Sequence, residues 1–159
     1  MIKDKKILVL GIGNTILSDD GIGPKIIRDL SLVFNERNIS FKEACCGGIE
    51  IAELISGYDC VVFIDAIRTL EGKPGDIYYF DFFDFRETMH LSNFHDLNFI
   101  TAIELARSLG MNLPSSIHII GIEILTDSEF GEDLSQPLKE RYCMILEEIK
   151  RFIEEIANS

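Results

Sequence analysis

Short apolar, β-branched runs alternate along this chain with segments in which apolar residues recur every three or four positions. Strands and helices that alternate in this way pack in layers, so the pattern predicts a three-layer α/β/α sandwich with a twisted, mostly parallel five-stranded sheet. The expected strands are Lys6–Gly11, Ile39–Cys46, Cys60–Asp65, Asp76–Phe82 and Ile117–Ile124. The expected helices are Gly21–Phe34, Ile49–Ile55, Leu97–Leu109 and Ser135–Ile156.

Two of these elements carry further expectations. The segment Asp76–Phe82 follows the preceding strand after only a short turn, whereas a parallel crossover needs a dozen or more residues. We therefore expect this strand to be antiparallel or to lie at an edge. The last helix has one apolar stripe, which we interpret as core packing. The stripe consists of Leu138, Tyr142, Ile145, Ile149, Phe152 and Ile156.

The bulk composition restricts the partners that this chain can bind. Its 159 residues suggest a single domain, residues 1–159, and no apolar run is long enough to span a bilayer. The formal net charge of -12 repels nucleic acid and anionic lipid, so neither is an expected partner. The basic N-terminus runs directly into the first strand without a cleavage site, which predicts a cytoplasmic protein. The strong core patterns and the single candidate site predict a monomer.

Four cysteines are present, without a C-x-x-C pair. They are Cys45, Cys46, Cys60 and Cys143. We expect reduced, mostly buried thiols, because Cys60 opens an apolar strand and Cys143 falls in the last helix. The pair Cys45–Cys46 precedes two glycines and leaves open a position near a site.

The stretch Leu10–Lys25, "LGIGNTILSDDGIGPK", joins the first strand to the first helix and holds four glycines and two adjacent aspartates. Glycine-rich turns of this kind usually bind phosphate, but Asp19 and Asp20 would repel it. The dinucleotide fingerprint fails because Ile16 stands where its third glycine belongs, and no G-K-[ST] of a P-loop follows. Asp19 is expected to cap the following helix.

A carboxylate, that of Asp65, also ends the expected third strand. In open α/β sheets, ligands bind beyond the carboxyl ends of the strands, where both Asp20 and Asp65 are expected. A charged residue that closes so apolar a run as "CVVFIDAI" favours a functional role over a turn cap. His95 precedes the third helix, whose start can lie at the same edge. Asp20, Asp65 and His95 would then form a divalent-metal set with open positions, although a histidine at a helix start is also a common surface cap.

The other two histidines have different interpretations. His118 alternates within the last strand and is expected to be structural, whereas His90 lies in the same segment as His95.

These motifs resemble the opening of the hydrogenase maturation endopeptidases. The family pattern is a strand, G-x-G-N and then D-[DE]-x-x-G, and "ILVLGIGNTILSDDGIGPKII" contains it in full. The resemblance continues through Gly47–Gly48, "VVFIDAI", "KPGDIYYFD" from Lys73, His95 and "IHIIGIEI" to the final helix, and so covers nearly the whole chain. Where family members often carry Asp before the two glycines, this chain has Cys46.

The resemblance implies removal of a short C-terminal extension from a nickel-loaded precursor of the nickel–iron hydrogenase large subunit. It implies that Asp20, Asp65 and His95 bind metal and carry the activity, with His90 as the alternative ligand. Nickel would be supplied by the substrate, and no organic cofactor is implied. Asp19 is a candidate base for activating water.

Two rival functions remain at this stage. One is a non-cleaving nickel-binding maturation or chaperone module of the same fold. The other is a nucleotide- or flavin-binding domain, which the two loop aspartates disfavour.

Overall fold

The computed structural model describes residues 4–45, 48–87 and 94–159, and the side chains of 85–99 lie outside the description. A five-stranded sheet forms its centre, in the spatial order β2-β1-β3-β5-β4. The strands are β1 (Ile7–Ile12), β2 (Ile39–Ala44), β3 (Cys60–Ile67), β4 (Ile77–Asp81) and β5 (Ser116–Glu123). The first four strands from the β2 edge are parallel, and β4 pairs with β5 in the antiparallel direction. The expected mostly parallel sheet and its antiparallel edge strand are both confirmed.

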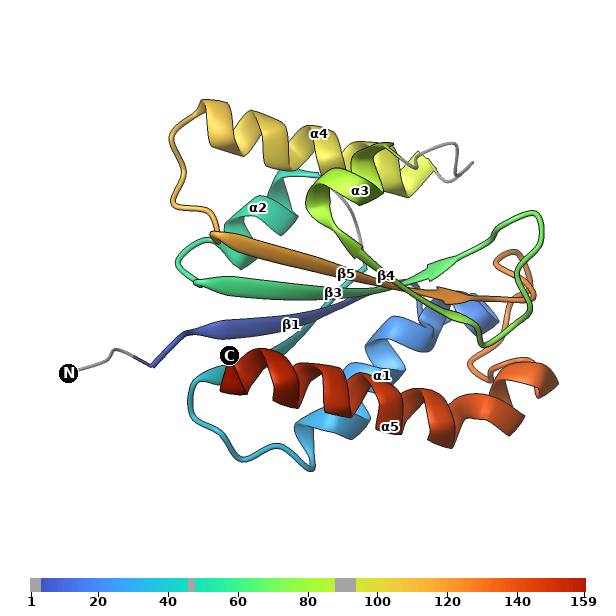
Figure 1. Cartoon of the computed structure of the whole chain (residues 1–159). Coiled ribbons are helices and arrows are strands. Elements are labelled where there is room, and N and C mark those ends of the chain that lie inside the picture. The colour runs from blue at the N-terminus through green and yellow to red at the C-terminus, as the bar shows by residue number, and fades with distance from the viewer. Residues whose placement is uncertain (1–3, 46–47, 88–93) are drawn as a thin grey trace.

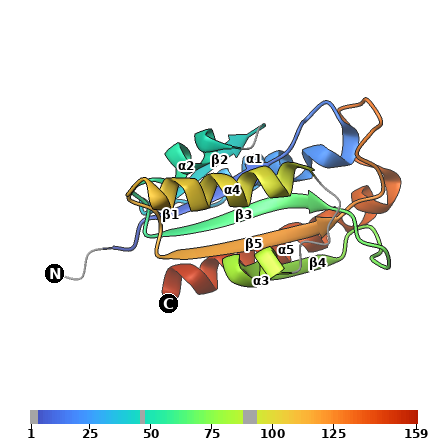
Figure 2. The same ribbon diagram turned by 90° about the horizontal axis from the view of Figure 1, so that it is seen from above.

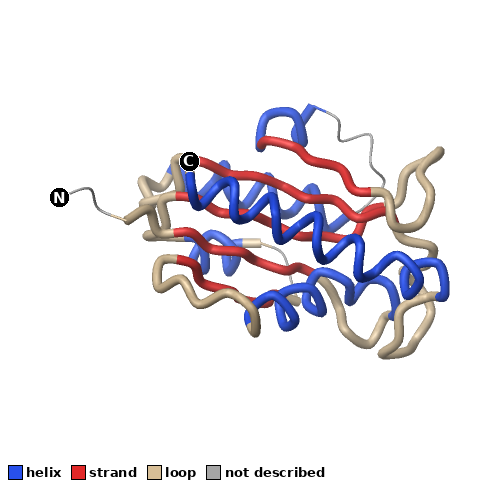
Figure 3. Tube along the Cα trace, turned by 60° about the horizontal axis from the view of Figure 1, so that its bottom comes forward, coloured by secondary structure: helices blue, strands red, loops and turns tan. Residues whose placement is uncertain are grey.

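Helices cover both faces of the sheet, as Figures 1 and 2 show. They are α1 (Ile22–Ser31), α2 (Ile49–Ile55), α3 (Phe82–Glu87), α4 (Phe94–Ser108) and α5 (Gln136–Asn158), and a 3-10 turn, η1 (Ser18–Gly21), precedes α1. Helices α1 and α5 lie on one face, while α2, α3 and α4 lie on the other. Figure 3 shows α5 running along the strands of its face. The three-layer α/β/α sandwich is therefore confirmed.

Apolar side chains of the central strands fill the space on both faces, because parallel strands flanked by helices are buried on both sides. Along β3, Val62 and Ile64 pack with α1 and α5, whereas Val61 and Phe63 pack with α2 and α4. The apolar stripe of α5 is core packing, as expected. Four of its members are buried, namely Leu138, Ile145, Ile149 and Ile156, and Ile153 is buried beside them. Tyr142 and Phe152 are partly buried and pack against the same core.

Several sequence expectations need correction. Strand β3 continues to Ile67, so Asp65 lies inside it and not at its end. Helix α3 was not expected. It follows β4 directly, and Asp81 Oδ1 accepts a hydrogen bond from the backbone N–H of Asp84 at 2.7 Å, which caps its first turn.

The thiols are also less buried than expected. Of the described cysteines, Cys60 is buried, whereas Cys45 and Cys143 are exposed, and all three are free. Cys46 lies outside the described residues. No helix in the described part of the chain combines the length and apolarity that crossing a membrane requires.

Candidate functional site

Two of the predicted site residues lie near the carboxyl ends of β1 and β3, which are side by side in the sheet. Strands β1 and β3 are paired neighbours, with Gly11 opposite Ile64. Asp65 is the next residue along β3, and Asp20 lies in η1, which follows β1. The sheet topology therefore places both segments at one edge, as the sequence predicted.

The glycines of the first loop serve close backbone packing. A methyl group on Gly23 would lie 2.5 Å from the carbonyl oxygen of Ile64 and 2.7 Å from that of Ile12. A methyl group on Gly13 would lie 2.0 Å from the carbonyl oxygen of Asp20. Because Gly23 has no side chain, the start of α1 can pack closely against the ends of β1 and β3. Because Gly13 has none, η1 can fold back against the end of β1. The loop thus packs a carboxylate-bearing turn against the sheet.

Both candidate carboxylates are half-buried and held by backbone groups. Asp20 Oδ2 accepts a hydrogen bond from the N–H of Asn14 at 2.8 Å, and Asp65 Oδ1 accepts one from the N–H of Ala66 at 2.9 Å. Carboxylates accept several partners at once, so this orientation is compatible with a further ligand on each.

The histidine of the predicted set falls where the backbone alone is described. His95 is the second residue of α4, and its side chain lies outside the described residues, as does all of His90. Figure 1 shows the first turn of α4 at the end of the sheet toward which β1, β3 and β5 point. Among the side chains that are described, no three His, Cys, Asp or Glu groups gather as a metal site. Metal ligation by the trio therefore stays a prediction.

Asp19 has a different role from the one expected. Its side chain is fully buried, and Oδ2 accepts hydrogen bonds from the N–H groups of Leu125 and Thr126, at 3.1 and 3.3 Å. Ser135 donates its N–H to Oδ1 at 2.6 Å and its hydroxyl to Oδ2 at 2.8 Å. Ser135 precedes α5, so Asp19 holds the start of α5 and not of α1. These contacts occupy the carboxylate in fixing loops, which argues against its role as the water-activating base.

Sequence reasoning missed a second buried carboxylate at this edge. Glu123 ends β5 with 3% exposure, and its Oε1 and Oε2 accept hydrogen bonds from the N–H and hydroxyl of Thr69 at 2.7 and 2.9 Å. A methyl group on Gly72 would lie 2.2 Å from Oε2, so the loop between β3 and β4 wraps tightly around it. The signal was an acid that closes an apolar strand, the same pattern that marked Asp65.

A partly exposed ion pair fixes the other side of that loop. Arg141 of α5 donates to Asp76 Oδ1 at 3.1 Å and to the carbonyl oxygen of Pro74 at 2.9 Å. The N–H of Lys73 donates to Asp76 Oδ2 at 2.9 Å, and this hydrogen bond together with that from Arg141 lowers the pKa of the Asp76 carboxyl. The loop is therefore anchored from both the sheet and α5.

Comparison with known protein families gives a match over most of the chain. Residues 24–152 match the family model HycI, hydrogenase maturation protease. The chain belongs to the hydrogenase maturation protease family. The matched residues contain Asp65 and His95, whereas Asp20 precedes them.

Two curated relatives extend the comparison. The hydrogenase expression/formation protein HupD of Thiocapsa roseopersicina is 26% identical over 150 residues, which cover 92% of this chain and 67% of that protein. The coenzyme F420 hydrogenase subunit delta of Methanothermobacter thermautotrophicus is 31% identical over 84 residues, which cover 49% of this chain and 52% of that protein. The chain thus spans about two thirds of the first and half of the second.

Solved structures share the fold of this family member. The hydrogenase maturating endopeptidase HybD from E. coli superposes with a TM-score of 0.80 at 21% identity, covering 94% of this chain and 93% of that one. The [NiFe] hydrogenase maturation protease HybD from Thermococcus kodakarensis gives 0.72 at 24% identity, covering 96% and 99%. The three-layer sandwich is therefore the architecture of known maturation proteases.

Proposed function

We propose that this chain removes the C-terminal extension of a nickel-loaded precursor of a nickel–iron hydrogenase large subunit. Membership of the hydrogenase maturation protease family over residues 24–152 is the observation that carries the proposal. The placement of Asp20 and Asp65 at one sheet edge supports it, because that edge is where α/β sheets bind their ligands.

The nickel in this proposal belongs to the substrate. Asp20, Asp65 and His95 would contact it, since carboxylate oxygen and imidazole nitrogen are donors that bind divalent metals. Asn14 and Ala66 orient the two carboxylates through their backbone N–H groups. Contact with a loaded metal would restrict cleavage to precursors that have already received nickel.

The reaction is hydrolysis of one peptide bond. The oxygen of a water molecule attacks the scissile carbonyl carbon, the C–N bond breaks, and the leaving nitrogen takes up a proton. A metal at the site polarises the carbonyl or lowers the pKa of water. The chain's own contribution is to bind the tail and hold it beside Asp20 and Asp65.

We further propose that the protein works as a cytoplasmic monomer without an organic cofactor. The site in this proposal is built from η1, β3 and α4 of one chain, so it needs no second copy. Sedimentation of the purified protein measures the oligomeric state directly.

The experiment that tests the proposal measures the intact mass of purified nickel-loaded precursor before and after incubation with this protein. We expect the mass to fall by that of a C-terminal peptide. Asp20→Asn and Asp65→Asn should abolish this loss of mass, because each replaces a charged carboxylate ligand by a neutral amide of similar volume. Asp4→Asn is the matched control, since Asp4 is exposed and precedes β1 at the opposite end of the sheet.

Two outcomes would contradict the proposal. Unprocessed precursor after incubation with the native protein would favour a module that binds nickel without cleaving. Normal cleavage by both aspartate variants would remove Asp20 and Asp65 from the site while leaving the activity in place.

A further inference from the structure

Three loops gather at the carboxyl edge of the sheet, and hydrogen bonds join them. They are residues 12–21, 68–76 and 124–135, and Figures 1 and 2 both show them together at the end toward which β1, β3 and β5 point. Leu17 pairs with Gly131, and the N–H of Gly131 donates to the carbonyl oxygen of Ile16 at 2.9 Å. Arg68 donates to Asp127 Oδ1 at 3.2 Å. The loops therefore form one connected surface.

Large apolar side chains are exposed on all three loops. Leu70 is 104% exposed, Phe130 85%, and Ile16 and Leu125 51% each. We call these four side chains the loop patch. Each leaves apolar area in water that burial against a partner would remove, and a group of exposed apolar side chains beside a candidate site is typical of an interaction surface.

The buried carboxylates fix the loop patch relative to the candidate site. Asp19 accepts the N–H of Leu125 and directly precedes Asp20. Glu123 accepts the N–H of Thr69, which directly precedes Leu70. A partner that covers the loop patch is thus held in a set position beside Asp20, with little loop ordering to reduce its affinity.

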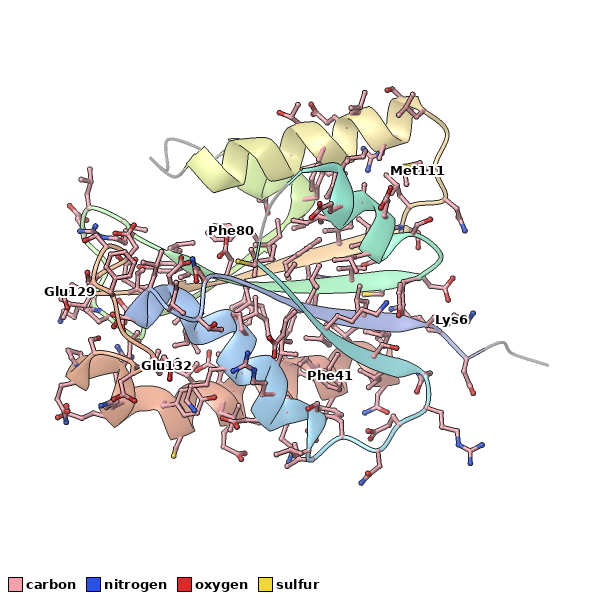
Figure 4. The ribbon with its side chains drawn as sticks, turned by 180° about the vertical axis from the view of Figure 1, so that it is seen from behind. Lys6, Phe41, Phe80, Met111, Glu129 and Glu132 are labelled. Atoms are coloured by element: carbon pink, nitrogen blue, oxygen red, sulfur yellow. The ribbon has the colours of Figure 1, made fainter. Side chains whose placement is uncertain are left out.

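The charge of the same loops restricts the partner. The three loops together hold eight acidic and two basic side chains. Two positive and eight negative charges leave a net charge of -6, which is half of the chain's net charge of -12. Glu129 and Glu132, beside Phe130, are exposed, and Figure 4 shows them at the end of the molecule opposite Lys6. Two copies of this surface would repel each other, whereas an apolar surface rimmed by basic side chains complements it.

We propose that the loop patch docks the folded body of the hydrogenase large-subunit precursor, at an apolar surface rimmed by basic side chains and separate from the tail that is cut. This inference rests on the proposed function. It assigns recognition of the folded precursor to Ile16, Leu70, Leu125 and Phe130, and chemistry to the neighbouring carboxylates.

The test compares the double variant Leu70→Ser/Phe130→Ser with the native protein, using immobilised nickel-loaded precursor. We expect the Kd for the precursor to rise about tenfold or more, because central apolar contacts dominate such interfaces. The rate of tail removal at saturating precursor should be unchanged, so KM rises and kcat does not. Urea unfolding should coincide with that of the native protein, since both side chains are exposed.

The matched control is Leu32→Ser/Leu109→Ser. Leu32 is 81% exposed and Leu109 67%, and they lie where α1 and α4 end, away from the three loops. This variant should bind and cleave like the native protein. A second variant, Glu129→Gln/Glu132→Gln, should slow association with the precursor and weaken its dependence on salt, because exposed charges steer encounter.

The outcomes separate this inference from the proposed function. If the native protein cleaves and the loop-patch variant binds and cleaves equally well, docking at the patch is wrong and the protease function stands. If the native protein binds without cleaving, the protease function is wrong. The change in Kd of the loop-patch variant then still tests whether the precursor docks at the loop patch. Absence of binding by the native protein overturns docking. A native dimer that the loop-patch variant converts to a monomer identifies a second copy as the occupant and also overturns it.

Discussion

The buried carboxylate of Asp19 binds both the backbone N–H and the hydroxyl of Ser135, 116 residues further along the chain. Through this pair, the turn after β1 and the start of α5 form one unit. The same carboxylate holds the N–H groups of Leu125 and Thr126, so the loop after β5 is part of that unit.

Replacing Asp19 should therefore destabilise the whole fold. Asp19→Ala leaves the partly buried donors of Leu125, Thr126 and Ser135 without their acceptor, and we expect the free energy of unfolding to fall by about 3–5 kcal/mol. Urea denaturation followed by circular dichroism measures this change. Asp4→Ala, at an exposed position, should alter the value by no more than about 0.5 kcal/mol. A native-like midpoint for Asp19→Ala would mean that the loops are held by other contacts.

His118 should make stability depend on pH. Burial, and to a lesser extent the charge of Lys5, lowers the pKa of its imidazole below the ordinary value of 6.5. The unfolded chain then binds more protons than the folded one between the folded pKa and 6.5. The stability that the neutral His118 imidazole contributes is fully present above its pKa in the unfolded chain. It is lost as the pH falls through its pKa in the folded chain.

The measurement is the free energy of unfolding across that window for the native protein and His118→Gln. The difference between their pH slopes isolates the imidazole from the carboxylates, which titrate in both proteins. Ser116 Oγ lies 2.9 Å from His118 Nε2, and the Phe152 ring lies at its edge, so glutamine keeps a polar partner for the serine. Parallel slopes would show that His118 has the same pKa in both states.

The layers and the sheet edge follow from local pattern, whereas the role of each acid does not. Apolar runs bounded by polar turns locate β1 and β3, and parallel pairing then brings their carboxyl ends together. Asp65 and Glu123 both lie near the end of an apolar strand, so the hydrophobic pattern cannot distinguish their roles. They differ because Thr69 folds over Glu123 and satisfies both of its oxygens, a contact across 54 residues.

Helix α3 and the burial of Asp19 were missed for related reasons. The run "YYFDFFDF" has no change in hydrophobicity where β4 ends, and the boundary comes from the cap that Asp81 supplies to Asp84. Asp19 and Asp20 are identical in type and adjacent in sequence. The return of the chain at Leu125, Thr126 and Ser135 supplies the partners of Asp19, which turns inward, whereas Asp20 stays half-buried.

Gly13 should control activity more strongly than stability. Alanine there would place its methyl group 2.0 Å from the carbonyl oxygen of Asp20, in a backbone with φ of +154°. Because backbone cannot yield like a flexible side chain, η1 must move, and Asp20 moves with it. We expect unfolding free energy to fall by about 1–3 kcal/mol. Tail removal should slow by about tenfold to a hundredfold, since small misplacements of reacting groups are costly.

Gly131→Ala is the matched control for this substitution. Gly131 lies in the neighbouring loop, and a methyl group there meets no heavy atom within 4 Å. Its rate of precursor cleavage, measured by intact mass at a temperature where both variants are folded, should equal that of the native protein. If Gly13→Ala cleaves as fast as Gly131→Ala, the position of η1 does not set the rate, and the contribution of Asp20 to the site would have to be small.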